Sequence, residues 1–384
     1  MARIWNKHEQ TNTPLKKKVF VALSGGVDSA VAAALLKEQG YEVTGIFMKF
    51  WQAPCDGSKN NGWNRCCSFE SQQRARAVAA ALGIRFYVLN FERQFKKEIV
   101  DYFLRELKAG RTPNPCVACN KEIKFGLLLN KALAIGACYV ATGHYARLRR
   151  ERNFDSKIAG NKGKSARLLK AKDKNKDQTY FLWQLNQKQL SKILFPIGEI
   201  ASKSEVRKLA KKFNLPVAET RESQEVCFIK NTTDEFLKKY LKEKPGEIKN
   251  KKGEALGRHS GLWFYTIGQR KGIGLPGGPW FAVAKDVKKN VLIVSKDEND
   301  LLSRELIAGK VNWLGGEPAD FQNIRAKIRY GIRPAKIKSM QKTGPDKYKI
   351  IFSRPQRAIT PGQSVVFYKN DELLGGGVIV SGSY

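Results

Sequence analysis

The segment that most constrains the fold is SGGVDS at residues 24–29, because it joins a strand pattern to a helix pattern. The apolar run KKVFVALS before it predicts a buried strand, and SAVAAALLKEQG after it predicts a helix that ends at Gly40. Glycines at such a junction let successive backbone N–H groups face one anion, and the helix N-terminus adds its positive end. The sequence therefore predicts a phosphate-binding loop after the first strand.

The alternation of strand and helix patterns continues to about residue 142. The further strand patterns are EVTGIFMKF, RFYVLNF and ACYVATG, and the helix patterns between them are SFESQQRARAVAAALG, FERQFKKEIVDYFLRELKAG and NKEIKFGLLLNKALAIG. This order predicts an α/β fold with a doubly wound, mostly parallel sheet that binds ligands at the carboxyl ends of its strands. After about Pro245, short strand patterns such as TPGQSVVFY and LLGGGVIVSG predict a small β-barrel.

These patterns divide the chain into parts. We expect a loose N-terminal extension at 1–16, a domain with the phosphate loop at 17–232, a largely β central domain at 233–305 and a C-terminal β-barrel at 306–384. Residues 149–176 are basic and without periodicity, which predicts a partly disordered insert. Residues 193–215 predict a helical excursion that packs on the central domain.

The charge of the chain favours one class of partner. There are 70 Lys and Arg residues against 35 Asp and Glu residues, which leaves a net charge of +35. A polyanion binds clustered cations with release of counterions, so nucleic acid is the leading partner, and a uniformly lysine-rich proteome is the alternative explanation. We find no apolar run long enough to span a bilayer and no signal-peptide pattern. We therefore expect a cytoplasmic protein with no membrane partner.

The cysteines predict chemistry more than they predict a disulfide scaffold, because their number is odd and no secretory signal accompanies them. The chain has seven, at positions 55, 66, 67, 116, 119, 138 and 227. Cys116 and Cys119 form a CxxC pair before Asn120, a predicted helix N-cap, and a helix N-terminus near lysines favours the thiolate. The pair could be a nucleophile, a redox pair or part of a metal site. No second CxxC accompanies it, which disfavours a tetrahedral zinc site.

The phosphate loop and several other motifs together resemble a known family. SGGVDS lacks the Walker pattern and resembles the pyrophosphate (PP) loop of ATP pyrophosphatases, in which Asp28 would suit magnesium. In chain order, SGGVDS, GRTPNP, CNKEIKF, ATGHYAR, NKDQTYFL, a late CFI, YTIGQRKGIG and TPGQSVVFY resemble the bacterial tRNA-specific 2-thiouridylases of the MnmA type. The resemblance extends from about residue 17 to the end of the chain.

The resemblance implies roles for particular residues. Cys119 matches the nucleophile and Cys227 the cysteine that carries a persulfide, and the two would form a disulfide. Asn114, Pro115 and Cys116 match the segment that contacts the target base. The positions that match the ATP site are Ala22, Leu23, Ser24, Gly25, Gly26, Val27, Asp28, Ser29, Met48 and Gly143. The positions that match contacts to tRNA are His144, Lys176, Asp177, Gln178, Arg329, Tyr330 and Gln363.

The implied reaction is ATP-dependent 2-thiolation of the wobble uridine in the anticodon stem-loop. Adenylation of the 2-carbonyl converts a poor leaving group into AMP, and pyrophosphate is released. A persulfide on Cys227, loaded by a sulfur-donor protein, would deliver sulfur, and Cys119 would attack the disulfide that forms. The target base would have to leave the stack to be reached.

One departure from the family pattern leaves the sulfur route open. The family often has Asp where this chain has Cys116, and a thiol cannot reproduce the hydrogen bonds of a carboxylate. Cys116, Cys119 and Cys227 could instead converge as three ligands of a four-iron four-sulfur cluster with one open iron. Two other functions compete with thiolation: a small-molecule ligase with the same loop, and a non-catalytic RNA-binding protein.

Overall fold

The fold was analysed in a computed structural model that describes residues 16–53, 68–151, 165–220, 226–229 and 232–382. Nearly all of the predicted N-terminal extension, residues 152–164 of the predicted insert, and Cys55, Cys66 and Cys67 lie outside these ranges. In the described part of the chain, no helix is long and apolar enough to cross a membrane.

The N-terminal half is built on a five-stranded parallel sheet in the order β3-β2-β1-β4-β7. Its strands are β1 (Lys18–Ala22), β2 (Glu42–Lys49), β3 (Arg85–Asn90), β4 (Tyr139–Ala141) and β7 (Ile193–Leu194). Successive β1 residues enter different cores, since Val19 and Val21 pack in one cluster while Phe20 and Ala22 pack in another. Burial on both faces confirms the predicted doubly wound sheet.

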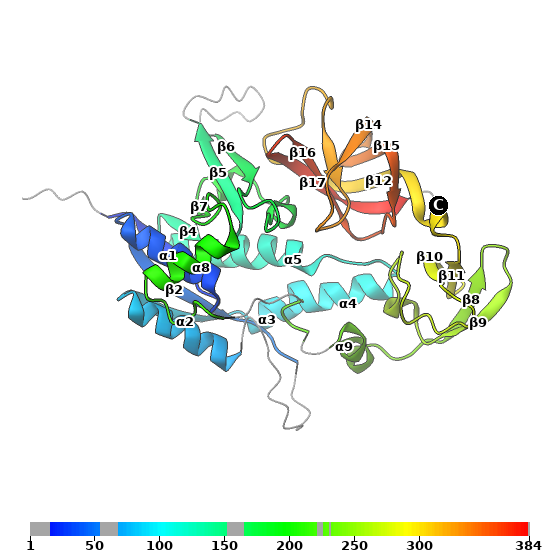
Figure 1. The fold of residues 1–384 in the computed structure, drawn as a ribbon, viewed down its shortest axis with the longest axis horizontal. Coiled ribbons are helices and arrows are strands. Elements are labelled where there is room, and N and C mark those ends of the chain that lie inside the picture. The colour runs from blue at the N-terminus through cyan, green and yellow to red at the C-terminus, as the bar shows by residue number, and fades with distance from the viewer. Residues whose placement is uncertain (1–15, 54–67, 152–164, 221–225, 230–231, 383–384) are drawn as a thin grey trace, which may run out of the picture.

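Helices cover both faces of this sheet and extend from it toward the rest of the molecule (Figure 1). The helices of this half of the chain are α1 (Val27–Glu38), α2 (Phe69–Ala81), α3 (Glu92–Phe95), η1 (Lys96–Val100), α4 (Asp101–Lys108), α5 (Pro115–Ala118), η2 (Cys119–Leu128), α6 (Leu129–Ala134), η3 (Thr179–Phe181), α7 (Gln187–Leu190) and α8 (Lys203–Lys212). The expectation that residues 193–215 pack on the central domain is wrong. Val206 and Ala210 of α8 lie in the same cluster as the apolar face of α1, and β7 joins the parallel sheet.

The middle of the chain forms a small four-stranded sheet in the order β10-β11-β8-β9. Its elements are α9 (Thr233–Tyr240), β8 (Gly246–Asn250), β9 (Ala255–His259), η4 (Leu262–Phe264), β10 (Phe281–Asp286), β11 (Val291–Ser295) and η5 (Glu298–Leu301). Ile248, Leu292 and Val294 are buried in its own apolar cluster. This part also contacts the N-terminal half, because a Cβ added at Gly110 would collide with Val287.

The C-terminal part is a six-stranded antiparallel barrel, closed by the pairing of β12 with β17. Its strands are β12 (Leu302–Trp313), β13 (Arg325–Lys327), β14 (Ala335–Gly344), β15 (Lys347–Arg357), β16 (Ser364–Lys369) and β17 (Glu372–Gly382). The predicted inward face is confirmed, since Ile324, Ala326 and Ile328 are buried in the barrel core.

The predicted insert is more ordered than its composition suggested. Strands β5 (Ala146–Glu151) and β6 (Ser165–Lys170) form an antiparallel hairpin, and β6 pairs with β17 of the barrel through Leu168 and Leu169. The hairpin thus extends the barrel sheet with strands from the N-terminal half. The sequence analysis did not predict this hairpin. The mixture of Arg and Leu residues in ARLRRE and SARLLK resembles a charged loop unless the partner strand is known.

A buried ion pair accompanies this strand pairing. The Asp177 carboxylate, which follows β6, lies 3.7 Å from the Lys327 ammonium of β13, and both side chains are almost fully covered. Thr179 donates its hydroxyl to Asp177 at 2.9 Å, and the Ala171 backbone N–H donates at 3.2 Å. The barrel is therefore held to the N-terminal half by both backbone and charge contacts.

We predict that Asp177→Ala lowers the free energy of unfolding by about 3–5 kcal/mol, because it leaves a buried ammonium without its counter-charge. The double variant Asp177→Ala/Lys327→Met should lose less than Asp177→Ala alone, since no uncompensated charge remains. Urea unfolding of the three proteins measures both values. A double variant at least as unstable as the single one would show that the ion pair does not stabilise the junction.

His144 lies in the core of the N-terminal half, although it was expected to contact tRNA. Its ring packs between Phe125 and Phe195, and its Nδ1 lies 2.6 Å from the Thr142 hydroxyl. Burial, with a smaller contribution from Lys124, holds the pKa of His144 well below its usual value of 6.5. The imidazole is therefore neutral in the folded protein at neutral pH.

We predict that this histidine makes the fold sensitive to mild acid. Between pH 7 and pH 5.5 the unfolded chain takes up a proton on His144 that the folded chain does not, so stability falls as pH falls, at up to about 1.4 kcal/mol per pH unit. Unfolding free energies at both pH values should show a smaller decrease for His144→Phe than for the unaltered chain. An equal decrease in the two proteins would contradict this assignment.

Candidate active site

The SGGVDS loop leaves strand β1 and opens helix α1 in a closely packed turn. The Ser29 hydroxyl accepts from the Ser24 N–H at 3.1 Å and donates to the Gly26 carbonyl at 3.1 Å. No side chain caps the N-terminus of α1, whose N-cap is Gly26. The first N–H groups of α1 therefore keep the arrangement that binds an anion.

Two glycines let this turn exist. Gly25 has a φ of +76°, and a Cβ there would collide with the Ser71 carbonyl of α2. A Cβ on Gly143, after β4, would lie 2.7 Å from the backbone of Asp28 and Ser29. Of the residues expected to bind ATP, Gly143 thus lies directly against the loop, while Met48 lies at the carboxyl end of the adjacent strand β2.

Three side chains that the sequence did not single out hold the loop. Lys203, the first residue of α8, lies 2.6 Å from Asp28 Oδ1, and the Tyr145 hydroxyl donates to the same oxygen at 2.7 Å. Arg74 of α2 donates to the Gly25 carbonyl at 3.1 Å. Tyr145 lies within the quoted motif ATGHYAR and could have been found there. Lys203 and Arg74 could not, because only the tertiary fold brings α8 and α2 to the loop.

The helix that carries Cys119 starts earlier than expected. Helix α5 begins at Pro115, with the Asn114 side chain accepting from the Val117 N–H at 3.3 Å, and it continues without a break into η2 and α6. The prediction that Asn120 is the N-cap is wrong. Asn120 is buried inside the helix, where its amide donates to the Phe181 carbonyl at 3.1 Å. Pro115 at the first helical position, preceded by an Asx cap, explains the earlier start.

The three candidate thiols differ in exposure. Cys116 is exposed, Cys119 is 7% exposed, and Cys227 is half-buried. Cys119 belongs to the large apolar cluster beneath the sheet, and Cys227 packs against the same cluster. Phe228, next to Cys227, is packed edge-to-face against Phe95 and Phe103 of the α3–α4 segment. The fold thus brings Cys119 and Cys227 to one core although they lie far apart in the chain.

The donor arrangement does not fit the suggested iron–sulfur cluster. Three ligands to one cluster must converge on it, whereas Cys116 is exposed, Cys119 is buried and Cys227 is half-buried. Among the residues that the structure describes, no three His, Cys, Asp or Glu side chains form a group that could hold a metal ion. The expected convergence of Cys116, Cys119 and Cys227 is therefore not found.

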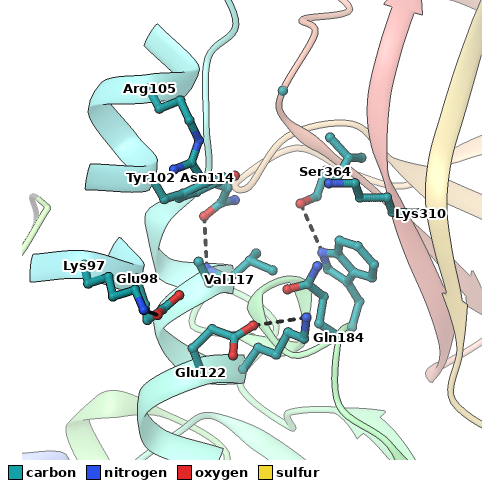
Figure 2. Close-up of a pocket in the computed structure, with 15 residues that line it drawn as sticks. Lys97, Glu98, Tyr102, Arg105, Asn114, Val117, Glu122, Gln184, Lys310 and Ser364 are labelled. Carbon is teal, nitrogen blue, oxygen red and sulfur yellow. Dashed lines mark hydrogen bonds and ion pairs between the residues drawn. The ribbon is translucent and has the colours of Figure 1, made fainter. Parts of the chain in front are cut away.

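A cavity of about 330 Å³ lies where the continuous α5–η2 helix meets the barrel (Figure 2). Asn114, Val117 and Lys121 contribute one helix face to it, and Lys310 and Ser364 contribute the barrel side. Of the expected target-base segment, Asn114 lines the cavity and Pro115 and Cys116 do not; Cys119 does not line it either. Its four basic and two acidic lining side chains have the same ratio as the 70 basic and 35 acidic residues of the whole chain, so charge does not distinguish it.

The residues expected to contact tRNA fall into two groups. His144 and Asp177 are buried, and Asp177 holds the domain junction. The exposed or half-buried members lie near that junction. Tyr330 is 40% exposed and its ring centroid lies 4.5 Å from that of Phe181. Gln363 donates to the Thr112 carbonyl at 3.0 Å, which ties the barrel to the loop before Asn114.

The remaining members of this set have backbone partners. The Gln178 side-chain oxygen accepts from the Tyr145 N–H at 3.1 Å, and Arg329 donates to the Ala358 carbonyl at 3.4 Å. The Lys176 N–H donates to the Asp173 carbonyl at 3.2 Å, and its side chain is half-buried. The Gln178 and Lys176 contacts lie within the N-terminal half and the Arg329 contact lies within the barrel, whereas the polar contacts of Asp177 and Gln363 cross between the two parts.

Comparison with known families matches the chain in three consecutive segments. The family model described as the tRNA methyl transferase HUP domain matches residues 17–231. The tRNA methyl transferase PRC-barrel domain matches residues 234–296, and the aminomethyltransferase beta-barrel domain matches residues 303–379. The three matches follow the parallel sheet, the small central sheet and the closed barrel described above.

Curated relatives are similar over nearly the full chain. The tRNA-specific 2-thiouridylase MnmA of Bacillus velezensis is 48% identical over 377 residues that cover 95% of both chains. The protein of the same name from Carboxydothermus hydrogenoformans is 46% identical and covers 95% of this chain and 98% of the relative. A solved U34-tRNA thiolase, NcsA from Methanococcus maripaludis with its four-iron four-sulfur cluster, is 19% identical at a TM-score of 0.32, over 59% of this chain and 68% of its own. That likeness is too distant to carry an argument.

The three family matches and this extent of similarity lead to one conclusion: the chain belongs to the family of tRNA-specific 2-thiouridylases.

Proposed function

We propose that the chain is a tRNA sulfurtransferase that uses ATP to replace the 2-oxygen of the wobble uridine with sulfur. The observation that carries the proposal is that Cys119 lies in one apolar cluster and Cys227 packs against the same cluster, in a domain that also contains the SGGVDS loop. The matching family description mentions methyl transfer, but the curated relatives are named for thiolation. A loop that binds the ATP phosphates is what adenylation of the uridine requires, and this supports thiolation over methyl transfer.

The loop at residues 24–29 is the proposed site of the ATP phosphates. Backbone N–H groups at the start of α1 would face the anion, and Lys203 would add positive charge beside it. One carboxylate together with substrate phosphates is the usual way in which proteins bind magnesium, so Asp28 fits as a ligand. The ion would neutralise charge on the phosphates during pyrophosphate release.

The cysteines are the proposed sulfur machinery. A persulfide on Cys227 attacks the adenylated carbon and AMP leaves. Cys119 then attacks the sulfur of Cys227, which releases the thiolated base and leaves a disulfide between Cys119 and Cys227. Cys119 makes the second attack in this sequence. Its burial supports that role, because water is kept away from its sulfur.

The proposed RNA surface is the border between the N-terminal half and the barrel. Tyr330 offers an exposed ring for a base, and Arg329, Lys176, Gln178 and Gln363 lie along the border. His144 and Asp177 are buried, and their proposed role is to hold in place the elements that carry these residues. The partners in this proposal are tRNA, bound at its anticodon stem-loop, and a sulfur-donor protein, and the location is cytoplasmic.

We predict that Gly25→Ala raises the KM for ATP or lowers the rate of pyrophosphate release roughly tenfold or more, because the new Cβ collides with the Ser71 carbonyl at a positive φ. Gly40→Ala is the matched control. Gly40 also has a positive φ, of +83°, but its Cβ would meet no atom within 4 Å. Equal effects of the two substitutions would argue that backbone strain, and not the loop, is responsible.

We predict that Cys119→Ser and Cys227→Ser each lower tRNA thiolation by roughly a thousandfold or more, while tRNA-dependent pyrophosphate release from ATP persists. Mass spectrometry of the digested tRNA measures the first activity, and a pyrophosphate assay measures the second. Cys138→Ser, at another exposed cysteine, is the control. Pyrophosphate release without tRNA would indicate a small-molecule ligase, and no release under any condition would indicate an RNA-binding protein.

A further inference from the structure

Cys116 and Cys119 are one helical turn apart but differ sharply in access to solvent. Cys116 is exposed, whereas Cys119 is 7% exposed and belongs to the apolar core. Helix geometry separates two Cα atoms at positions i and i+3 by about 5 Å, which is within the range of 4.4–6.8 Å found in disulfides. The two sulfurs can therefore bond after a small movement of the first helical turn.

The first turn of this helix is the part best able to make that movement. Its first residue, Pro115, has no N–H, and the N–H groups of a first turn have no partners within the helix. In this turn the Asn114 side chain caps the Val117 N–H, the Ala118 N–H donates to the Asn114 carbonyl at 3.4 Å, and the Cys119 N–H donates to the Pro115 and Cys116 carbonyls. Cys119 is held more firmly, because the next residue, Asn120, is fixed to the Phe181 carbonyl.

The proposed thiolation reaction creates a need for such a movement, and the inference rests on that proposal. Each turnover leaves a disulfide between Cys119 and Cys227, which must be reduced before Cys227 can carry sulfur again. Cys119 is covered by the core, and Cys227 packs against the same core. Thiol–disulfide exchange requires attack along the S–S axis at one of the two sulfurs, and both are less exposed than Cys116, so an external reductant reaches this bond less readily than a bond at Cys116.

We propose that Cys116 is the resolving thiol of the enzyme. The Cys116 thiolate attacks the Cys119 sulfur, a bond forms between these two atoms, and the bond from Cys119 to Cys227 breaks. The electron pair leaves on Cys227, which takes up the proton that Cys116 released. This exchange regenerates the Cys227 thiol and moves the disulfide to the exposed first turn of α5.

The second step is reduction of the new disulfide by an external dithiol. One thiolate of the dithiol attacks the Cys116 sulfur and its second thiolate closes its own disulfide, so that two electrons and two protons pass to Cys116 and Cys119. Exposed disulfides are the readily reduced class, which suits a bond that must open in every cycle. The arrangement explains why a thiol stands at Cys116, in a CxxC spacing that the nucleophile alone does not require.

The test follows the disulfide through one catalytic cycle of the full-length protein. The enzyme, carrying a persulfide and free of reductant, is mixed with ATP and tRNA, quenched with an alkylating agent and digested with trypsin. Cys116 and Cys119 share the peptide of residues 112–121, and Cys227 lies in a separate peptide. The expected product is peptide 112–121 with an internal disulfide, two hydrogens lighter than its reduced form, together with alkylated Cys227.

Cys116→Ser should instead accumulate the disulfide between Cys119 and Cys227. With a protein dithiol such as a thioredoxin as reductant, its later turnovers should be roughly tenfold or more slower than its own first turnover. Cys138→Ser, which removes another exposed thiol, should behave as the unaltered chain does. Because Cys116 is exposed, its replacement should not impair folding, and equal melting temperatures check this.

Four outcomes would overturn the inference. Cys119–Cys227 disulfide in the unaltered chain, with no internal disulfide in peptide 112–121, would show that Cys116 does not exchange. About four irons per chain in anaerobically prepared protein, lost in Cys116→Ser, would make Cys116 a cluster ligand. An unaltered chain that yields no thiolated tRNA in its first turnover would refute the proposed function and this inference with it. Normal thiolation with Cys116→Ser turning over as fast as the unaltered chain would refute the inference alone.

Discussion

The junction between the catalytic half and the barrel depends on one strand pairing and one buried ion pair. Strand β6 joins β17, and a few residues later Asp177 meets Lys327 out of contact with water. A buried ion pair is costly unless both partners are in place, so it favours a single arrangement of the two parts. The same segment continues into Tyr180, whose hydroxyl donates to the Ser364 carbonyl. The barrel border and the Cys119 helix are therefore placed together.

The candidate active site draws its residues from three places: the edge of the parallel sheet, the core beneath the sheet, and the barrel. The phosphate loop lies at the carboxyl edge of the sheet, Cys119 lies in the core beneath the sheet, and the exposed ring of Tyr330 comes from the barrel. Asn120 connects the last two, because its amide holds the Phe181 carbonyl and Phe181 packs on Tyr330. A chain of contacts thus links the exposed ring at the barrel border to the residue that follows Cys119.

Much of the fold could be predicted because its signals are local. Val19 to Ala22 alternate between two cores, and Ile324, Ala326 and Ile328 share one barrel face, as their spacing indicated. The errors occurred where distant partners decide the structure. The β5–β6 hairpin needed β17, helix α8 needed the face of α1, and Asn120 became a buried donor because Phe181 lies beside it. The start of α5 at Pro115 was a local signal that the CxxC motif obscured.

The sequence by itself determined the phosphate loop, the doubly wound order and the candidates Cys119 and Cys227, because strand periodicity, glycine positions and cysteine identity are written in the chain. Only the tertiary structure decided which groups meet them. Lys203 and Tyr145 reach Asp28, Cys227 reaches the core of Cys119, and Cys116 remains at the surface. The physical reason is that burial and side-chain contacts depend on residues far away in the chain, which pack together only when the whole core forms.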